Sequence, residues 1–326
     1  MMELETLAEA IRQVGDKAHP WRGFLMVAER QRRLTKNGDP FLTLRLADAG
    51  AAVDAVLFSD NPSFEKAADP AVAYVAVRGN LERNPKYGLQ LAIADIRPVR
   101  EEDRELGFDE SLLTPSTPYD IEALWGELEG LAGELGHEKL RETVQVLLKE
   151  NEEAARSWPA AQRVHQAYRG GWLEHTLFVA RDAKYYAQKY PELDGDLLLA
   201  GAILHDVGKL LELNGEPTCE FTDEGRLVGH VVLGARMARE TAAKTGLDGR
   251  TLLLLEHLIL AHHGEREYGA AVLPKTREAV VLHHIDNIDA KLGIFRRHVE
   301  EDPTGGDWTG RAWEFGNQSL WRGDVD

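Results

Sequence analysis

The chain has a single cysteine, Cys219, among its 326 residues, and no long apolar run. One thiol cannot form an internal disulfide or a cysteine-based zinc cluster, and a lone cysteine in a Pro-Thr loop is most simply inert. A membrane-spanning helix needs about eighteen consecutive apolar residues, and the sequence contains no such stretch. Residues 1–18 are acidic and amphipathic, unlike a signal peptide. We therefore expect a soluble, cytoplasmic protein with no membrane partner.

Positive charge is also scarce, because 38 Lys and Arg stand against 55 Asp and Glu, a formal charge of −17. Cations that neutralise phosphates supply most non-specific affinity for nucleic acid, so the balance argues at first against that partner. The charge is unevenly placed, however. Residues 19–100 hold 12 Lys and Arg against 9 Asp and Glu. The acidic excess lies outside this segment, and bound divalent ions would neutralise part of it.

The length favours two or more domains. Residues 1–18 contain a short helical pattern that ends at Gly15. Residues 19–100 contain five runs of strand character, separated by turn signals such as Asn37-Gly38-Asp39-Pro40: residues 23–28, 41–47, 53–58, 73–82 and 89–96. Five strands in about 80 residues predict a small barrel of the OB-fold type, the five-stranded barrel that often binds single strands.

The second of these strands places an aromatic ring and a cation on one face. Its leucines alternate with Phe41, Thr43 and Arg45, and a single-strand platform needs rings for stacking and cations for phosphates. The predicted nucleic-acid contacts are Lys36, Phe41, Arg45, Phe58 and Tyr87, together with the cluster Arg30, Arg32 and Arg33. For each residue an ordinary role in the core, a hairpin or a solvated face remains an equal alternative.

Helical spacing replaces strand spacing after the barrel. Residues 101–160 begin as a polar, proline-rich linker and continue as two helices, and residues 161–298 have helical period throughout, which predicts an all-α second domain. The overall class is therefore multidomain α+β. Residues 299–326 carry Trp308, Trp313, Phe315 and Trp321, too many aromatics for a free tail. We expect this tail to pack on the second domain or on another copy in a homo-oligomer.

His205 and Asp206 stand side by side in an apolar segment, and Lys209 follows one turn after His205. Alone, this pair could be a structural histidine bonded to a carboxylate. Further metal-ligand residue types surround it in the sequence: His175, His230, His262, His263 and Asp286. Adjacent helical residues point about 100° apart, so both members of the pair reach one centre only if ions lie between them and neighbouring helices. That geometry suits an aspartate that bridges two ions.

Mixed imidazole and carboxylate ligands fit divalent transition metals better than Ca²⁺. We expect two such ions per chain. The ligand types do not choose among Mn²⁺, Fe²⁺, Co²⁺ and Zn²⁺, and we take Mn²⁺ as the first candidate. Two ions would polarise a phosphoryl group, supply hydroxide and stabilise the leaving oxygen. Asp206 and Lys209 are the predicted catalytic residues. Asp206 is the expected bridge between the ions, and the Lys209 ammonium could meet a substrate phosphate. A solvated or ion-paired lysine is the alternative.

The full set of motifs resembles the HD superfamily of metal-dependent phosphohydrolases: Leu173-Glu174-His175-Thr176, His205-Asp206-Val207-Gly208-Lys209, Gly229-His230, His262-His263-Gly264 and Asp286. Further segments are similar to the YhaM-type 3′-to-5′ exoribonucleases, which carry an OB-fold before the HD domain: Pro159-Ala160-Ala161, His165, Ala167-Tyr168, Gly170-Gly171, residues 285–291, Thr35-Lys36-Asn37-Gly38 and Leu89-Gln90-Leu91. The resemblance spans roughly residues 19–300. Two positions depart from it, since Gln166 replaces a usual histidine and Phe58 an expected tryptophan.

The resemblance implies two metal positions that share one carboxylate. The first has the ligands His175, His205, Asp206 and Asp286, and the second has Asp206, His230, His262 and His263. His230 could instead be a helix-start residue. At least one of His262 and His263 is expected to be a ligand, although adjacent helical side chains diverge. His257, His283 and His284 are expected to be structural.

Three functional hypotheses remain. The first is an exoribonuclease in which the barrel binds single-stranded RNA, with single-stranded DNA as a second candidate substrate, and the metals release nucleoside monophosphates. The second is an HD phosphohydrolase of nucleotides or cyclic dinucleotides with a regulatory barrel. The third is a binding protein with a structural metal site. The barrel favours the first hypothesis, and its small positive charge predicts weak, salt-dependent RNA binding.

Overall fold

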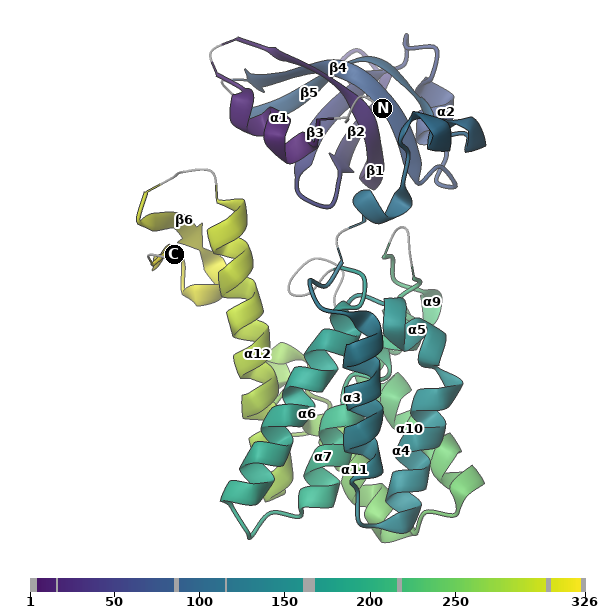
Figure 1. Cartoon of the computed structure of the whole chain (residues 1–326), viewed down its shortest axis with the longest axis vertical. Helices are drawn as coiled ribbons and strands as arrows, with labels where there is room; N and C mark the ends of the chain where they lie inside the picture. The colour runs from purple at the N-terminus through teal and green to yellow at the C-terminus, as the bar shows by residue number, and fades with distance from the viewer. Residues whose placement is uncertain are drawn as a thin grey trace. The chain divides into compact units, whose positions relative to one another are not determined.

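The computed structural model describes residues 5–15, 17–84, 88–114, 116–160, 168–215, 219–302 and 306–323. The chain divides into two compact units, Met1–Ser116 and Thr117–Asp326. Strands dominate the first unit and helices the second (Figure 1), which confirms the multidomain α+β class. Within the described ranges, no helix is long and apolar enough to cross a membrane.

The first unit is a closed five-stranded barrel of the OB type, as predicted. Its strands are β1 (His19–Leu34), β2 (Pro40–Ala47), β3 (Ala52–Phe58), β4 (Tyr74–Asn84) and β5 (Gly88–Pro98). The strand order is β1-β2-β3-β5-β4, and β1 also pairs with β4. Among the strand pairs of the described barrel, only β3–β5 is parallel. Two short helices, α1 (Leu7–Gln13) and α2 (Phe64–Ala68), pack against the barrel core.

The alternation in β2 sorts its side chains as the sequence predicts. Leu42, Leu44 and Leu46 are buried in the barrel core. The register pairs Arg33 of β1 with Phe41 of β2, and pairs Phe41 in turn with Phe58 of β3. Directly paired antiparallel residues point to the same face. The barrel therefore carries a row of one cation and two rings on its outer surface.

The polar segment after residue 100 packs on the barrel instead of bridging freely to the helices. It forms two 3₁₀ turns, η1 (Glu101–Leu106) and η2 (Glu110–Leu112). The Asp103 carboxylate is buried and accepts bonds of 2.6 and 2.7 Å from the Arg97 guanidinium. The ring of Phe108 meets the edges of the Phe24 and Tyr74 rings. These contacts join the segment to the barrel within the first compact unit, Met1–Ser116.

The second unit is a helical bundle, coloured teal to yellow in Figure 1. Its helices are α3 (Ile121–Gly133), α4 (Glu138–Glu150), α5 (Glu152–Ser157), α6 (Gly171–Lys189), α7 (Gly195–Leu204), α8 (Lys209–Glu212), α9 (Asp223–Leu227), α10 (His230–Thr245), α11 (Gly249–Ala261), the 3₁₀ turn η3 (Arg266–Tyr268) and α12 (Arg277–Glu301). Residues 197–204 of α7 are all buried. A helix that is apolar all round must lie inside a bundle, so α7 is the central helix.

The aromatic tail packs on α12 of the same unit. It forms β6 (Trp308–Ala312), the turn η4 (Trp313–Phe315) and β7 (Gln318–Trp321), and the two strands pair as a hairpin. Glu314 is the main contact, because it pairs with Arg297 at 3.2 Å and with His298 at 2.8 Å, both on α12. The Phe295 and Phe315 rings meet edge to face at 5.7 Å. These contacts fix the hairpin to the C-terminal part of α12.

Gly208 allows the turn after α7 to approach α10 closely. A Cβ atom at this position would press against the carbonyl oxygen of His230 and lie 2.5 Å from the amide nitrogen of Gly234. Both neighbours are backbone atoms of α10, so neither can rotate away. The absence of a side chain at Gly208 therefore sets the distance between the segment that carries His205 and Asp206 and the helix that begins at His230.

We expect Gly208→Ala to destabilise the helical unit by roughly 1–3 kcal/mol, the usual cost of forcing an extra methyl into a packed site. Thermal or urea unfolding would measure the loss. Gly126→Ala is the matched control, since Gly126 lies on an exposed face of α3 with nothing near its Cβ position. Alanine there should be neutral or stabilising by up to about 1 kcal/mol. Equal stability of the two variants would contradict the close approach at Gly208.

Candidate metal centre

The predicted metal ligands come from five places in the helical unit, mostly at helix ends. His175 lies in the second turn of α6, and Asp286 lies within α12. His205 and Asp206 follow α7 directly, and His230 is the first residue of α10. His262 and His263 follow the last residue of α11. The fold brings all seven side chains together from positions spread over roughly 110 residues.

Three of these residues form a first cluster: His175, His205 and Asp286. One ligand atom from each lies within 4.8 Å of the others. The Nε2 atom of His175 is 3.2 Å from Nε2 of His205 and 3.2 Å from Oδ1 of Asp286. The two histidines are fully buried. We call this group the Asp286 cluster.

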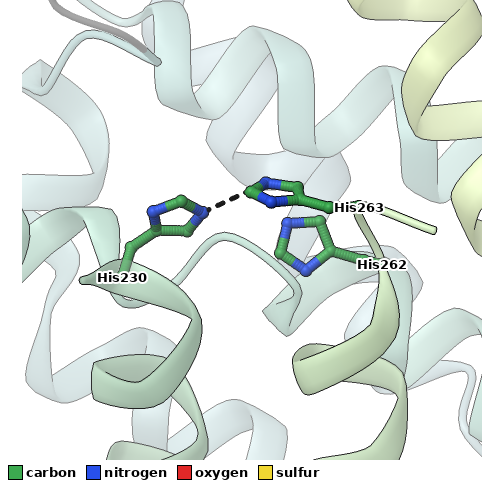
Figure 2. A group of neighbouring side chains, drawn as sticks. All are labelled: His230, His262 and His263. Atoms are coloured by element: carbon green, nitrogen blue, oxygen red, sulfur yellow. Dashed lines mark hydrogen bonds between the residues drawn. The ribbon is translucent and has the colours of Figure 1, made fainter. Parts of the chain in front are cut away.

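The second cluster consists of His230, His262 and His263 (Figure 2). The view shows His230 approaching from one helix end and the adjacent pair His262 and His263 from another. Nε2 of His230 lies 3.3 Å from Nε2 of His263. Both His262 and His263 face His230, so the predicted divergence of neighbouring side chains does not exclude either from the group. We call this group the His263 cluster.

Asp206 lies between the two clusters and presents one carboxylate oxygen to each. Its Oδ2 is 3.6 Å from Nε2 of His175 and 3.4 Å from Nε2 of His205. Its Oδ1 is 3.5 Å from Nε2 of His230 and 3.6 Å from Nε2 of His262. This is the arrangement expected of a carboxylate that bridges two ions.

Several side-chain atoms of the predicted ligand residues lack a hydrogen-bond partner among the described residues. They are Oδ1 of Asp206, Nε2 of His262 and Nδ1 of His263, all buried. A buried polar atom without a partner costs about 1–3 kcal/mol, so native proteins rarely leave such atoms unexplained. The mixture of imidazole nitrogen and carboxylate oxygen suits a divalent transition metal. The residues present therefore fit bound divalent metal.

The electrostatics of the centre also favour a cation. Burial acts to raise the pKa of the Asp206 carboxyl, but nearby Lys209 and His205 hold that pKa well below its usual range. Burial likewise lowers the pKa of His262 well below its usual value and that of His263 to about 4. At neutral pH these groups are therefore an anionic carboxylate and two neutral imidazoles, the protonation states that bind metal.

Lys209 lies inside the centre, where its ammonium contacts the bridging carboxylate. Its Nζ atom is 2.6 Å from Oδ2 of Asp206, and its side chain is 11% exposed. Lys209 is therefore ion-paired in the structure, as the alternative expects, and the pair lies beside the predicted ligands. A contact of Lys209 with a substrate phosphate remains a prediction.

The predicted nucleic-acid contacts are a pair of rings, two cations and one residue outside the described ranges. Phe41 and Phe58 lie side by side on the barrel with ring centroids 6.0 Å apart, and Phe58 is 54% exposed. Arg45 is paired with Asp54 at 3.2 Å, so its charge is partly neutralised, whereas Lys36 is exposed in the β1–β2 turn. Tyr87 lies outside the described residues, as do His165 and Gln166.

Two arginines of the predicted basic cluster are bound by the barrel itself. Arg30 donates to the carbonyl oxygens of Asp69 and Val72. Arg32 pairs with Glu65 at 3.1 Å and lies over the Phe64 ring. Arg33 is the cluster member that lies in register with the two rings. The row Arg33, Phe41 and Phe58, in which Phe41 is half-buried and the other two are exposed, is therefore the best-formed candidate for single-strand contact.

Sequence patterns missed two acidic residues beside the histidines. Nδ1 of His175 is 2.6 Å from Oδ2 of Asp289, and Nδ1 of His230 is 3.0 Å from Oε1 of Glu212. Asp289 follows Asp286 by three residues on α12, a spacing that places both on one helix face, and this signal could have identified it. Glu212 carries no comparable signal, because its contact with His230 depends on how α8 meets α10.

Other histidines have structural contacts. Nδ1 of His283 donates to the backbone carbonyl of His262 at 3.0 Å, and Nε2 of His257 accepts from the amide of Lys275. Burial raises the pKa of the Cys219 thiol to about 11. The thiol therefore stays protonated at neutral pH, as expected of an inert cysteine.

Comparison with known proteins agrees with this centre. The HD domain family model matches residues 172–291. The 3′-5′ exoribonuclease YhaM of Bacillus subtilis is 32% identical over 312 residues, which cover 96% of each chain. YhaM of Shouchella clausii is 34% identical and covers 92% of each chain. YhaM of Halalkalibacterium halodurans is 33% identical, covering 95% of this chain and 94% of its own.

These relatives match almost the whole chain, barrel and helical unit together, and the HD match includes all seven predicted metal ligands. The HD domain and the His and Asp clusters indicate divalent metal binding and a hydrolytic enzyme. The chain belongs to the family of YhaM 3′-5′ exoribonucleases.

Proposed function

We propose that this protein is a metal-dependent 3′-5′ exoribonuclease that hydrolyses single-stranded RNA to nucleoside monophosphates. The observation that carries the proposal is the position of Asp206, with one carboxylate oxygen facing each of the two clusters. The names of the relatives supply the substrate class and the direction. The barrel supplies a surface suited to a single strand.

The proposed ligand sets share Asp206. His175, His205 and Asp286 complete one set, and His230, His262 and His263 complete the other. We propose two ions per chain, with Mn²⁺ as the first candidate. When bound, such ions polarise the scissile phosphate, lower the pKa of water and stabilise the leaving oxygen.

The protein's own residues hold and orient the RNA. Asp206 is shared by the two ligand sets. The Lys209 ammonium lies 2.6 Å from the Asp206 carboxylate and places a positive charge where a phosphate oxygen would approach. On the barrel, Phe41 and Phe58 stack against bases while Arg33 and Lys36 meet phosphates. We propose that the barrel, residues 19–100, binds the strand and that the HD domain, residues 161–298, cuts its 3′ end.

Replacing the bridging carboxylate by its amide, Asp206→Asn, should reduce RNA hydrolysis to background, because an amide oxygen carries no formal charge to hold two cations. RNA binding by the barrel should remain. A gel-based hydrolysis assay and a filter-binding assay would separate the two effects. Asp194→Asn is the control, since Asp194 caps α7 through the amide of Leu197 and asparagine caps as well. Full hydrolysis by the Asp206 variant would exclude this metal centre as the catalyst.

The double variant Phe41→Ala with Phe58→Ala should raise KM for a long single strand by roughly 10–100-fold or more, because stacking contributes about 1–3 kcal/mol per base. KM for a dinucleotide should hardly change. Leu106→Ala is the control, since Leu106 is a 65% exposed apolar residue of the same unit that lies on η1 and not on the strands that carry the two rings. Equal effects on both substrates would favour a phosphohydrolase of small nucleotides over an exoribonuclease.

A time course on 5′-labelled RNA should give a ladder that shortens from the 3′ end in the presence of Mn²⁺ and stops with EDTA. Mass spectrometry of metals in the purified protein should find close to two transition ions per chain. The same assay on 5′-labelled single-stranded DNA tests whether that substrate is also cut. Endonucleolytic fragments, or undiminished cleavage in EDTA, would refute the proposed reaction.

A further inference from the structure

Two of the clustered histidines are held from behind by carboxylates, and two by backbone carbonyls. Asp289 accepts from Nδ1 of His175 at 2.6 Å, and Glu212 accepts from Nδ1 of His230 at 3.0 Å. Nδ1 of His205 and Nδ1 of His262 each donate at 2.8 Å to a carbonyl one turn earlier in their own helices. Each cluster therefore contains one histidine held by a carboxylate and one held by a backbone carbonyl.

In a neutral ring each of these contacts favours the tautomer with its proton on Nδ1. An imidazole that donates from Nδ1 keeps its lone pair on Nε2. In all four histidines Nε2 is the atom that faces Asp206, at 3.4–3.6 Å. A carboxylate acceptor does more than a carbonyl, because its negative charge also makes the imidazole a stronger ligand.

We propose that Asp289 and Glu212 are positioning residues, each of which orients one histidine and strengthens metal binding in one cluster: Asp289 through His175 in the Asp286 cluster, and Glu212 through His230 in the His263 cluster. The inference rests on the proposed metal function. It assigns separate, testable roles to two acidic residues that touch no predicted substrate or metal position.

Glu212 is well placed for this role because the surrounding backbone fixes it. Its Oε1 atom accepts the His230 amide at 2.9 Å as well as Nδ1, so one oxygen holds both the start of α10 and its first side chain. Its own carbonyl accepts from the amide of Thr222 at 2.9 Å. A residue at the first position of a helix has a less restrained backbone than one in the middle. The Glu212 contact supplies the missing restraint.

Asp289 uses the regular spacing of α12 instead. It lies three residues after Asp286, so one rigid helix supplies a direct member of the Asp286 cluster and the support for another member, His175. His175 is thereby held between Oδ1 of Asp286 on its Nε2 side and Oδ2 of Asp289 on its Nδ1 side. A shift of α12 would displace both contacts together.

The test measures Mn²⁺ binding by calorimetry to full-length protein stripped of metal with a chelator. Glu212→Ala and Asp289→Ala should each weaken one of the two binding steps by about 10–100-fold, the usual loss when the residue behind a metal-binding histidine is removed. Glu212→Gln and Asp289→Asn keep an oxygen acceptor but lose the charge, so they should recover part of the affinity. A purely structural role predicts no such graded recovery.

Double variants identify the histidine through which each carboxylate acts. Glu212→Ala should cause no further loss of Mn²⁺ affinity in a His230→Ala background, but Asp289→Ala should. In a His175→Ala background, Asp289→Ala should cause no further loss of Mn²⁺ affinity, but Glu212→Ala should. Non-additivity within a contacting pair and additivity between separate pairs is the behaviour of residues that act through one partner. Equal losses with and without the partner histidine would overturn the assignment.

Glu278→Gln is the matched control. Glu278 has the same exposed fraction as Glu212, 8%, and it also accepts a backbone amide, that of Asp194 at 2.9 Å. No contact joins it to a clustered histidine in the described chain, so its Mn²⁺ affinity should equal that of the wild type. Wild-type protein that binds none of Mn²⁺, Fe²⁺, Co²⁺ and Zn²⁺ would refute the proposed function itself. Wild-type binding with unchanged affinity in the Glu212 and Asp289 variants would refute only the positioning roles.

Discussion

The buried carboxylate of Asp206 is the constraint on which the helical unit depends. A charge inside a protein is stable only when other charges or hydrogen bonds compensate it. Here the Lys209 ammonium lies 2.6 Å from one oxygen, and the other oxygen has no partner among the described residues. The imidazole nitrogens that converge on Asp206 from the helix ends complete a ligand set for a cation, which under the proposed function supplies the remaining compensation. The close contact at Gly208 keeps the start of α10, with His230, near Asp206.

The arrangement explains why most of the predicted metal ligands lie at helix ends. A side chain in the middle of a helix can face only one direction, whereas residues at a terminus from several helices can meet at one point. His205, His230 and His262 all use this freedom, and the first and last are each fixed by a bond to a carbonyl one turn back. His230 has no preceding turn in its helix, so Glu212 from α8 takes that place.

The sequence predicted the parts of the molecule that depend on local pattern. Alternating leucines in β2 and helical spacing in α3 and α4 identified both folds, and the order of His and Asp residues identified the clusters. The full length of β1 was not predictable, because its second half carries Arg30, Arg32 and Arg33 and lacks apolar alternation. The contact of η1 with the barrel follows no local pattern either, since it includes an ion pair between the half-buried Arg97 guanidinium and the buried Asp103 carboxylate.

The uneven charge of the chain bears on how a polyanion could be accepted. The segment outside residues 19–100 carries the acidic excess, which repels the body of an RNA strand. At the centre, however, two divalent ions would exceed the charge of Asp206 and Asp286, and Lys209 would add one more positive charge. The attractive region of the catalytic unit is then confined to a point, while the barrel offers a ring pair with adjoining cations. Such a distribution fits the proposed function, in which nucleotides are removed one at a time from a strand end.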